Sequence, residues 1–410
     1  MAKKKMALLL SAVMAASLMS AAVVSADDDV VISSFDAHGY AIEEYDAMVA
    51  GFTEETGIKV EIQHAANDNV ALLQSRLNSG DLPDVFNSEG GTRALMYAEY
   101  AYDWSNDTDV LELFQEGTLD KCKDEEGRIF ALPWAFENMG MLYNKDCFEK
   151  AGITELPATV DELEECCKKL QDAGITPFAL AAKETWVLSQ LVTHFLMDKS
   201  LDGAGTNEAL LNGDVTVAEL PHIDNLFKML DLIVEYGPDK QLEIDWETSE
   251  SMFANGEAAM IEMGDWCQSM LNSFNPDANV AFLPMPVGDS AEDATVLSNC
   301  NWVYIVNKDS ENLEAAKEYV KYILTGPGVD WICNYQGLVP AAKTDKEVNA
   351  MLANDAKQYI DAGKTNGWIH TIAPADYSEM TGAYVQAYML GDMTKEEVID
   401  GIQAIWDDAA

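Results

Sequence analysis

The chain has 410 residues, of which 48% are hydrophobic and 9% are aromatic. This length and composition predict a globular protein of two or three domains and argue against a disordered, collagen-like or disulfide-held chain. Its 71 Asp and Glu residues outnumber its 25 Lys and Arg residues, so the formal net charge is -46. Such a surface repels phosphate backbones, and no nucleic-acid partner is expected. Only Arg76, Arg93 and Arg128 could hold an anion through paired hydrogen bonds, so a neutral or cationic ligand fits better.

The first 26 residues have the parts of an export signal. Three lysines at 3–5 precede an uncharged stretch at 6–26, which ends in small residues of the kind that a signal peptidase recognises. We expect residues 1–26 to be removed and the protein to be exported, to a periplasm or to the cell surface. The alternative is an uncleaved membrane anchor, since about 20 apolar residues can span a bilayer. The signal has no cysteine of a lipoprotein cleavage site, so no lipid anchor is expected.

Neither a metal site nor a cofactor is expected. The seven cysteines are odd in number and follow no zinc-binding spacing, which predicts that most of them are buried thiols. The five histidines are scattered along the chain. The sequence contains no signature of a serine or zinc hydrolase, of a dinucleotide-binding fold or of a calcium loop.

Hydrophobic patterns alternate between strands and helices along the whole chain. Strands are predicted at 30–35, 58–62, 84–86, 141–143, 258–263, 280–283 and 302–306. Helices are predicted at 45–52, 70–77, 160–173, 186–197, 223–236, 313–324 and 395–405. The alternation at 30–86 predicts a parallel sheet covered by helices. No repeat or low-complexity linker interrupts the pattern, which indicates two lobes that share strands.

Six segments stand in a characteristic order and spacing: FTEETGIKV at 52–60, GDLPDVF at 80–86, ALP at 131–133, LYNKDCFEKAG at 142–152, FANGEAAM at 253–260 with GDW at 264–266, and GLVPAAK at 337–343. Together they resemble the carbohydrate-type (family 1) extracellular solute-binding proteins of ATP-binding cassette importers. The likeness covers nearly all of the chain after residue 26. No single segment is diagnostic, but their order and spacing are.

The resemblance implies an α/β, two-lobed periplasmic-binding-protein fold, type II-like, with a ligand cleft between the lobes. It places lobe 1 at 27–135 and 301–338, and lobe 2 at 136–300 and 339–410. Three crossovers would join the lobes, at about 134–138, 297–301 and 337–343. It further implies a monomeric receptor without enzymatic activity, which captures a mono- or oligosaccharide and delivers it to a membrane permease.

Sugar recognition needs flat aromatic faces and planar polar side chains that bind hydroxyl groups in pairs. The resemblance puts Trp266 at a Gly-x-Trp position whose ring stacks on sugar. It puts Glu137 at a hydroxyl-binding position of the first crossover, and Glu184 and Trp186 in a loop that contributes polar and aromatic contacts. The structural alternatives are a core tryptophan at 266, a hinge salt bridge at 137 and plain packing at 186.

Two groups of further candidates follow from their places in the chain. Phe35, Asp36 and His38 lie in the first strand-to-helix turn, and Ser88 and Glu89 follow the third strand. Ligands of such folds bind beyond the carboxyl ends of strands. Asp36 has a competing interpretation as a helix cap.

The remaining candidates lie near the crossovers and the last helices. Asn299, Asn301 and Trp302 bracket the second crossover, and Trp134 adjoins the first. Residues 376–384 lack the Trp and Arg that maltose-binding members of the family have there, so a malto-oligosaccharide is doubtful. Trp368 and Tyr377 are candidates to replace them.

Two other functions stay open at this point. The same fold could bind a polyamine or another cationic solute, because an acidic, aromatic cleft suits a cation, and salt would then weaken binding. An extracellular glycoside hydrolase would need two carboxyl groups about 5 Å or about 6.5 to 9.5 Å apart across the sugar.

Overall fold

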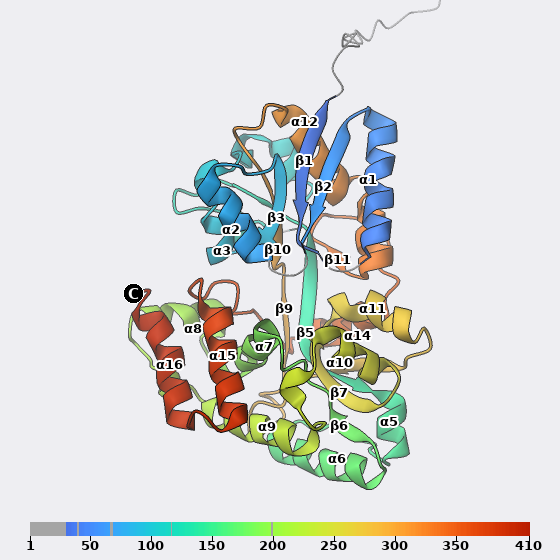
Figure 1. The fold of residues 1–410 in the computed structure, drawn as a ribbon, viewed down its shortest axis with the longest axis vertical. Helices are drawn as coiled ribbons and strands as arrows, with labels where there is room; N and C mark the ends of the chain where they lie inside the picture. The colour runs from blue at the N-terminus through green and yellow to red at the C-terminus, as the bar shows by residue number, and fades with distance from the viewer. Residues whose placement is uncertain (1–29, 39–40, 66–68, 116, 198–199) are drawn as a thin grey trace, which may run out of the picture.

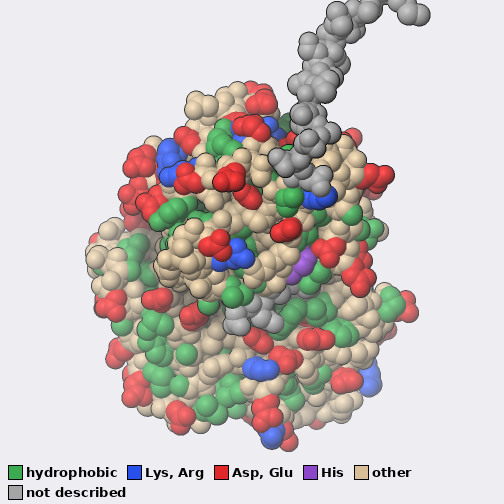
Figure 2. All heavy atoms as spheres, turned by 45° about the horizontal axis from the view of Figure 1, so that its top comes forward, with side chains coloured by type: hydrophobic (Ala, Val, Ile, Leu, Met, Phe, Trp, Pro, Cys, Tyr) green, Lys and Arg blue, Asp and Glu red, His purple; other side chains and the backbone are tan. Residues whose placement is uncertain are grey.

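The computed structural model describes residues 30–410 except 39–40, 66–68, 116 and 198–199. The predicted export signal lies outside these residues. Within them, every helix is too short or too polar to cross a membrane. Figure 1 shows two lobes, one above the other, and we call them the upper and the lower lobe. Acidic side chains are spread over both lobes on the face that Figure 2 shows, as the net charge leads one to expect.

The upper lobe is built on a five-stranded sheet in the order β2-β1-β3-β10-β4. Its strands are β1 (Val31–Asp36), β2 (Lys59–His64), β3 (Val85–Glu89), β4 (Leu132–Pro133) and β10 (Trp302–Val306). β1 runs parallel to β2 and β3, whereas β10 is antiparallel to β3 and β4. The parallel pairing expected for the first three strands is therefore confirmed, and β10 adds an antiparallel strand to them. β10 enters directly from the lower lobe, so it starts at the edge where β1 and β3 end and must run against them.

The lower lobe has a second mixed sheet in the order β12-β9-β5-β7-β6, in which β8 and β11 also pair with β5. Its strands are β5 (Ala135–Asn144), β6 (Thr176–Phe178), β7 (Ala258–Gly264), β8 (Val280–Leu283), β9 (Val296–Asn299), β11 (Val339–Pro340) and β12 (Thr365–Asn366). The long strand β5 is central, with antiparallel partners β7, β8 and β9.

Helices cover both sheets (Figure 1). Those of the upper lobe are α1 (Ile42–Thr56), α2 (Asn69–Ser79), α3 (Thr92–Leu95), α4 (Thr108–Leu111), α12 (Leu313–Thr325) and α13 (Val329–Trp331). Those of the lower lobe are α5 (Lys145–Lys150), α6 (Val160–Asp172), α7 (Thr185–Leu196), α8 (Asp202–Leu211), α9 (Ile223–Tyr236), α10 (Trp246–Ala254), α11 (Gln268–Phe274), α14 (Met351–Asp361), α15 (Tyr377–Leu390) and α16 (Lys395–Asp407).

Local sequence accounts for the main helices. α1 ends at Gly57, whose φ of 77° is a left-handed conformation that glycine adopts without strain. α6 begins after Thr159, whose side chain accepts a hydrogen bond from the backbone N–H of Glu162, and its apolar residues recur on one face. α7 is buried on every side from Val187 to Leu196 and forms the centre of the lower lobe. All seven cysteines lie in the described ranges, where each is a buried free thiol, as predicted for most of them.

The chain crosses between the sheets where strands of the two lobes follow each other directly. β4 passes to β5 through Trp134, and β9 passes to β10 through Cys300 and Asn301. A third passage runs through β11, which pairs with the start of β5. We keep the division into 27–135 with 301–338 and 136–300 with 339–410 as a proposal.

Candidate ligand-binding site

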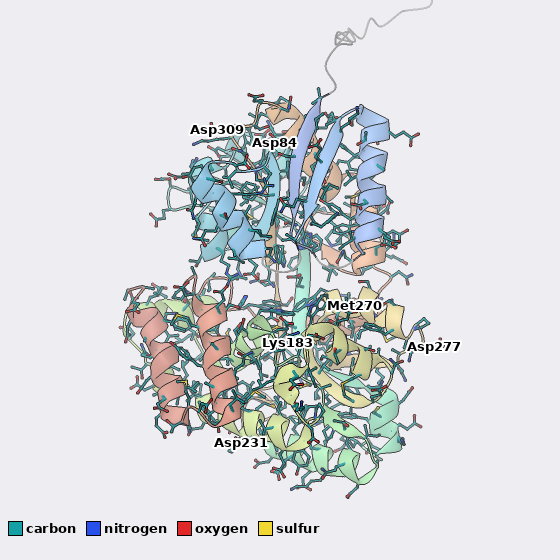
Figure 3. All side chains as sticks on the ribbon, in the orientation of Figure 1. Asp84, Lys183, Asp231, Met270, Asp277 and Asp309 are labelled. Atoms are coloured by element: carbon teal, nitrogen blue, oxygen red, sulfur yellow. The ribbon has the colours of Figure 1, made fainter. Side chains whose placement is uncertain are left out.

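A cavity of about 590 Å³ lies where the two lobes face each other. Its upper wall comes from the ends of β1 and β3, from the first turn of α2 and from the start of β10. Its lower wall comes from the starts of α7, α10 and α15, from the turn after β7 and from the segment after β12. Figure 3 labels the lining residue Lys183 in the half of the lower lobe that is nearer to the upper lobe. The volume lies in the range of small-molecule sites.

Six of the nine tryptophans line this cavity. They are Trp134, Trp186, Trp246, Trp266, Trp302 and Trp368. The rings of Trp266 and Trp368 lie 5.7 Å apart at 59° in the lower wall. In the upper wall, the ring of Trp134 stacks on His38 at 4.0 Å and 19°. Trp134, Trp266 and Trp368 are buried, whereas Trp186, Trp246 and Trp302 are half-buried, so both walls border the cavity with aromatic rings.

The backbone around Trp266 holds its ring in place. The buried carboxylate of Asp265 accepts hydrogen bonds from Asn138 N at 2.9 Å and from Asn138 Nδ2 at 2.6 Å, which fixes the end of β7 to β5. Burial raises the pKa of Asp265 to about 7. A Cβ at Gly264 would collide with the Trp266 ring, so the ring can fold back over this position only because it is glycine. This packing gives the Gly-x-Trp motif a physical reason.

Glu137 and Asn301 form a polar pair at the crossovers. Asn301 Nδ2 donates a hydrogen bond to Glu137 Oε2 at 2.9 Å, and both residues are buried and line the cavity. Burial raises the pKa of Glu137 to about 8, so the carboxyl group is mainly protonated at neutral pH. In the described part of the chain, Asn301 Oδ1 and the neighbouring Trp134 Nε1 are buried without a hydrogen-bond partner. A neutral carboxyl and an amide can both donate and accept hydrogen bonds, as recognition of hydroxyl groups requires.

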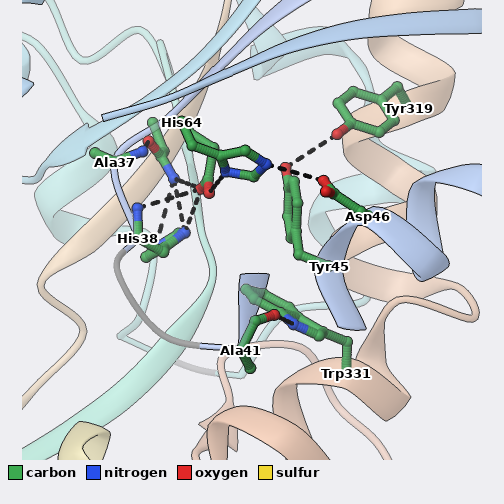
Figure 4. A network of polar contacts seen from close by, with 10 residues as sticks. Ala37, His38, Ala41, Tyr45, Asp46, His64, Tyr319 and Trp331 are labelled. Atoms are coloured by element: carbon green, nitrogen blue, oxygen red, sulfur yellow. Dashed lines mark hydrogen bonds and ion pairs between the residues drawn. The ribbon is translucent and has the colours of Figure 1, made fainter. Parts of the chain in front are cut away.

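A network of charged side chains supports His38 from behind (Figure 4). The buried carboxylate of Asp36 lies 2.8 Å from His38 Nδ1 and 2.9 Å from His64 Nδ1, and it accepts a hydrogen bond from Asn87 Nδ2 at 3.0 Å. Burial by itself would raise the pKa of Asp36, but the two histidines lower it to about 2. The hydrogen bond to Asp36 raises the pKa of His64 to about 9, with a smaller contribution from Asp46.

Charged groups at the cavity are partly paired. Arg93 lies 3.2 Å from Glu89 in the upper wall, and Lys183 lies 3.3 Å from Asp245 in the lower wall. Burial alone would raise the pKa of Glu89, but Arg93 and His370 lower it to about 2, so this carboxylate stays ionised. Among the described residues, no cluster of three or more His, Cys, Asp or Glu side chains could hold a metal ion.

Ten of the residues singled out from the sequence line the cavity. They are His38, Glu89, Trp134, Glu137, Glu184, Trp186, Trp266, Asn301, Trp302 and Trp368. Five others lie outside its lining: Phe35, Asp36, Ser88, Asn299 and Tyr377.

Each of these five has a definite place in the fold. Phe35 and Ser88 line a pocket of about 10 Å³ beside the cavity, and Asp36 lies behind His38. Asp36 does not cap a helix, because α1 begins after Ala41 and has no side-chain cap. Asn299 pairs with Glu137 across the β-ladder, and the Tyr377 hydroxyl lies 3.1 Å from Thr193 Oγ1 inside the lower lobe.

Sequence reasoning missed most of the polar part of the lining. The missed residues are Ala37, Asn69, Val70, Ala71, Arg93, Lys183, Thr185, Gln190, Asp245, Trp246, Glu247, His370, Thr371, Ser378 and Glu379. Trp246 carries a signal that could have been used, since it lies at the start of α10 after the capping Asp245, as the candidate Trp186 lies at the start of α7. The others come from loops and helix starts that meet only in the folded chain.

Two α/β lobes around an aromatic and polar cavity define a protein that binds a small solute. The chain belongs to the bacterial extracellular solute-binding proteins, whose family model matches residues 39–328.

Comparison with individual proteins gives the same class. The melibiose/raffinose/stachyose-binding protein MelE of Bacillus subtilis is 22% identical over 335 residues, which are 78% of this chain and 75% of MelE. The multiple sugar-binding protein of Streptococcus mutans is 22% identical over 298 residues, 68% of this chain and 67% of that protein. The solved structure of the solute-binding protein RafE with raffinose has a TM-score of 0.81 at 21% identity, covering 92% of this chain and 99% of RafE. At this identity the structural likeness shows a shared fold.

Proposed function

We propose that this protein is the extracellular receptor of an ATP-binding cassette importer and that it captures a mono- or oligosaccharide between its lobes. The observation that carries the proposal is the lining of the cavity, where six tryptophans alternate with carboxyl and amide groups. Tryptophan faces suit the C–H faces of sugar rings, and paired polar groups suit hydroxyls. The names of MelE and of the Streptococcus mutans relative, which bind sugars, support this ligand class.

The proposed binding mode assigns a role to each wall. Trp266 and Trp368 stack on the sugar from below, and Trp302 contacts it from above. Glu137, protonated at neutral pH, and Asn301 exchange hydrogen bonds with hydroxyl groups. The ligand favours the closed arrangement only through contacts that the open arrangement lacks. The closed form, as a monomer, then docks to the membrane permease of the importer.

Export and the lack of catalysis belong to the same proposal. The signal at 1–26 would bring the protein to a periplasm or the cell surface. The family consists of binding proteins, which supports a receptor over a glycoside hydrolase.

The test is a thermal-shift panel of the purified protein with melibiose, raffinose, stachyose, maltotriose, spermidine and an aryl glycoside. A sugar at about 100 times its dissociation constant should add roughly 2.7 kcal/mol and raise the Tm by a few degrees. A rise in Tm with spermidine alone would mean that the ligand is a cationic solute and not a sugar. Release of the aryl group from the aryl glycoside would establish hydrolysis. A Tm that no sugar of the panel changes would contradict the proposal.

A further inference from the structure

A short segment of the lower lobe reaches across to the upper lobe beside the cavity. We call residues 368–372, between β12 and α15, the bridging segment. Trp368, His370 and Thr371 of this segment line the cavity. Trp368 packs beside Trp266, and Ile372 O accepts a hydrogen bond from Asn207 Nδ2 of α8 at 3.1 Å. The segment is therefore anchored in the lower lobe and forms part of its ligand-facing wall.

The same segment is bonded to the upper lobe. Thr371 O accepts a hydrogen bond from Thr92 N at 3.0 Å, and Thr371 Oγ1 accepts one from Lys121 Nζ at 2.9 Å. Ile372 O accepts a further bond from Thr92 Oγ1 at 3.1 Å, and His370 Nε2 lies 3.7 Å from Glu89 Oε2. Three consecutive residues thus contact β3, α3 and the turn at Lys121.

The upper lobe is shaped to receive this segment. Gly91, which precedes α3, has φ 66°, and a Cβ there would collide with Thr371 O. Only glycine permits both this backbone conformation and this close approach. Lys121 is half-buried, and burial lowers its pKa to about 8, while its amine donates a hydrogen bond to Thr371 Oγ1.

These contacts lie on the ligand side of the crossovers, because His370 and Thr371 themselves line the cavity. Rotation of the lobes away from each other at the crossovers would separate Thr371 from Thr92 and Lys121. The contacts therefore favour the arrangement in which both lobes border one cavity.

We propose that the bridging segment couples the ligand to the position of the lobes: Trp368 contacts the ligand, while His370 and Thr371 hold the upper lobe in the closed arrangement. Gly91, Thr92 and Lys121 are then positioning residues for binding. The inference rests on the proposed function of the cavity as a sugar site. Neither the Gly-x-Trp motif nor the other segments that carry the family resemblance include these residues.

The main experiment uses Gly91→Ala, with Gly80→Ala as the matched control. Gly80 has φ 70°, but a Cβ there would meet nothing within 4 Å, so the control reproduces the backbone strain without the collision. X-ray scattering should show a larger radius of gyration for ligand-free G91A than for G80A. Calorimetry with raffinose should show an affinity about tenfold lower for G91A, since the apparent affinity falls with the fraction of closed protein.

A second set of variants keeps the test valid if G91A fails to fold. Lys121→Met and Thr371→Val remove the two ends of one hydrogen bond while keeping the side-chain volume. Each should lower raffinose affinity, and the double variant should lose no more than the larger single loss, because the two changes break the same bond.

Two results would overturn the proposal: raffinose affinity unchanged in folded variants, or scattering profiles equal to that of the wild type. If the wild type itself binds none of the sugars, the proposed function fails. The scattering of the ligand-free variants would still decide whether the segment positions the lobes.

Discussion

The two walls of the cavity use their polar side chains differently. In the upper wall, Asp36, His38, His64 and Asn87 bond to one another, and Glu89 is paired with Arg93. In the lower wall, Gln190 Oε1, Trp368 Nε1 and His370 Nδ1 are buried with no hydrogen-bond partner in the described part of the chain.

Buried polar atoms without partners are costly, so they persist where a ligand or water supplies the partner. The group around Asp36 behind the upper wall is held rigid by its own bonds, whereas these lower-wall atoms, like Asn301 Oδ1 and Trp134 Nε1 at the crossovers, are left ready to bond to a ligand. Variants in each wall should therefore change different quantities.

The largest effect is expected from Trp266→Ala in the lower wall. Loss of the ring removes stacking and lets water into the cavity, which should weaken sugar affinity by roughly 2 to 4 kcal/mol. Calorimetry with the sugar found in the panel measures this loss, and Trp266→Phe, which keeps an aromatic face, should lose much less. Equal sugar affinity of W266A and the wild type would show that the Trp266 ring does not contact the sugar.

A change in the upper wall should reduce stability more than binding. Asn87 accepts a hydrogen bond from Ala37 N at 2.8 Å and donates one to Asp36, so Asn87→Leu leaves the Ala37 N–H unpaired and removes one of the bonds to the buried Asp36 carboxylate. We expect the free energy of unfolding in urea to fall by roughly 2 to 3 kcal/mol. Asn255→Leu, which removes an exposed bond to Ser251 O, serves as the control and should change stability little. An N87L protein that is as stable as the wild type but no longer binds sugar would contradict the assignment of stability to the upper wall and of binding to the lower wall.

Gln190→Leu tests the lower wall, where a substitution should reduce sugar affinity and leave stability unchanged or higher. Replacing a buried amide whose oxygen has no partner should leave the Tm unchanged or raise it. Sugar affinity should fall by about 1 kcal/mol, the net value of one neutral hydrogen bond. Gln358→Leu, on the exposed face of α14, is the matched control for the change in side chain. Unchanged affinity of Q190L would show that its amide does not reach the ligand.

The smallest effect is a pH dependence of stability that arises in the upper wall. The pKa of His64 is about 9 in the folded protein and about 6.5 when unfolded. The stabilisation from its charge is complete below about pH 6.5 and is lost as pH rises to about 9.

The Asp36 carboxylate, with a folded pKa of about 2, contributes above about pH 4 and loses its contribution as pH falls. His64→Gln should therefore flatten the fall in Tm between pH 6.5 and 9. Asp46→Asn, which keeps the bond to Asp36, should flatten it only in part. An identical slope in H64Q and the wild type would mean that His64 is uncharged.

The sequence allowed the prediction of features that depend on local pattern. The helix at 160–173 could be predicted from a capping threonine and a regular apolar face, and Trp266 from a three-residue motif. The direction of β10 could not be predicted, because the hydrophobic pattern of a strand is the same in either direction. Only the crossover from β9 makes β10 antiparallel to β3. The rule that ligands bind beyond the carboxyl ends of strands placed Asp36 at the correct edge of the sheet. Its carboxylate, however, bonds to His64, 28 residues further along the chain, and lies outside the cavity lining.

The lower wall was harder to predict for a similar reason. The bridging segment follows a two-residue strand and has no regular hydrophobic pattern, so nothing local marks His370 or Thr371 as cavity residues. Their role depends on the approach to Gly91, 280 residues earlier in the chain, which only the folded structure reveals.

Calorimetric titration of the wild-type protein with raffinose at low and at high salt tests the central claim most directly. We predict saturable binding of one sugar per protein with the same Kd at both salt concentrations, because stacking and hydrogen bonds to a neutral ligand are little screened. Absence of binding to raffinose and to the other sugars of the panel, together with binding of spermidine that weakens at high salt, would contradict the account.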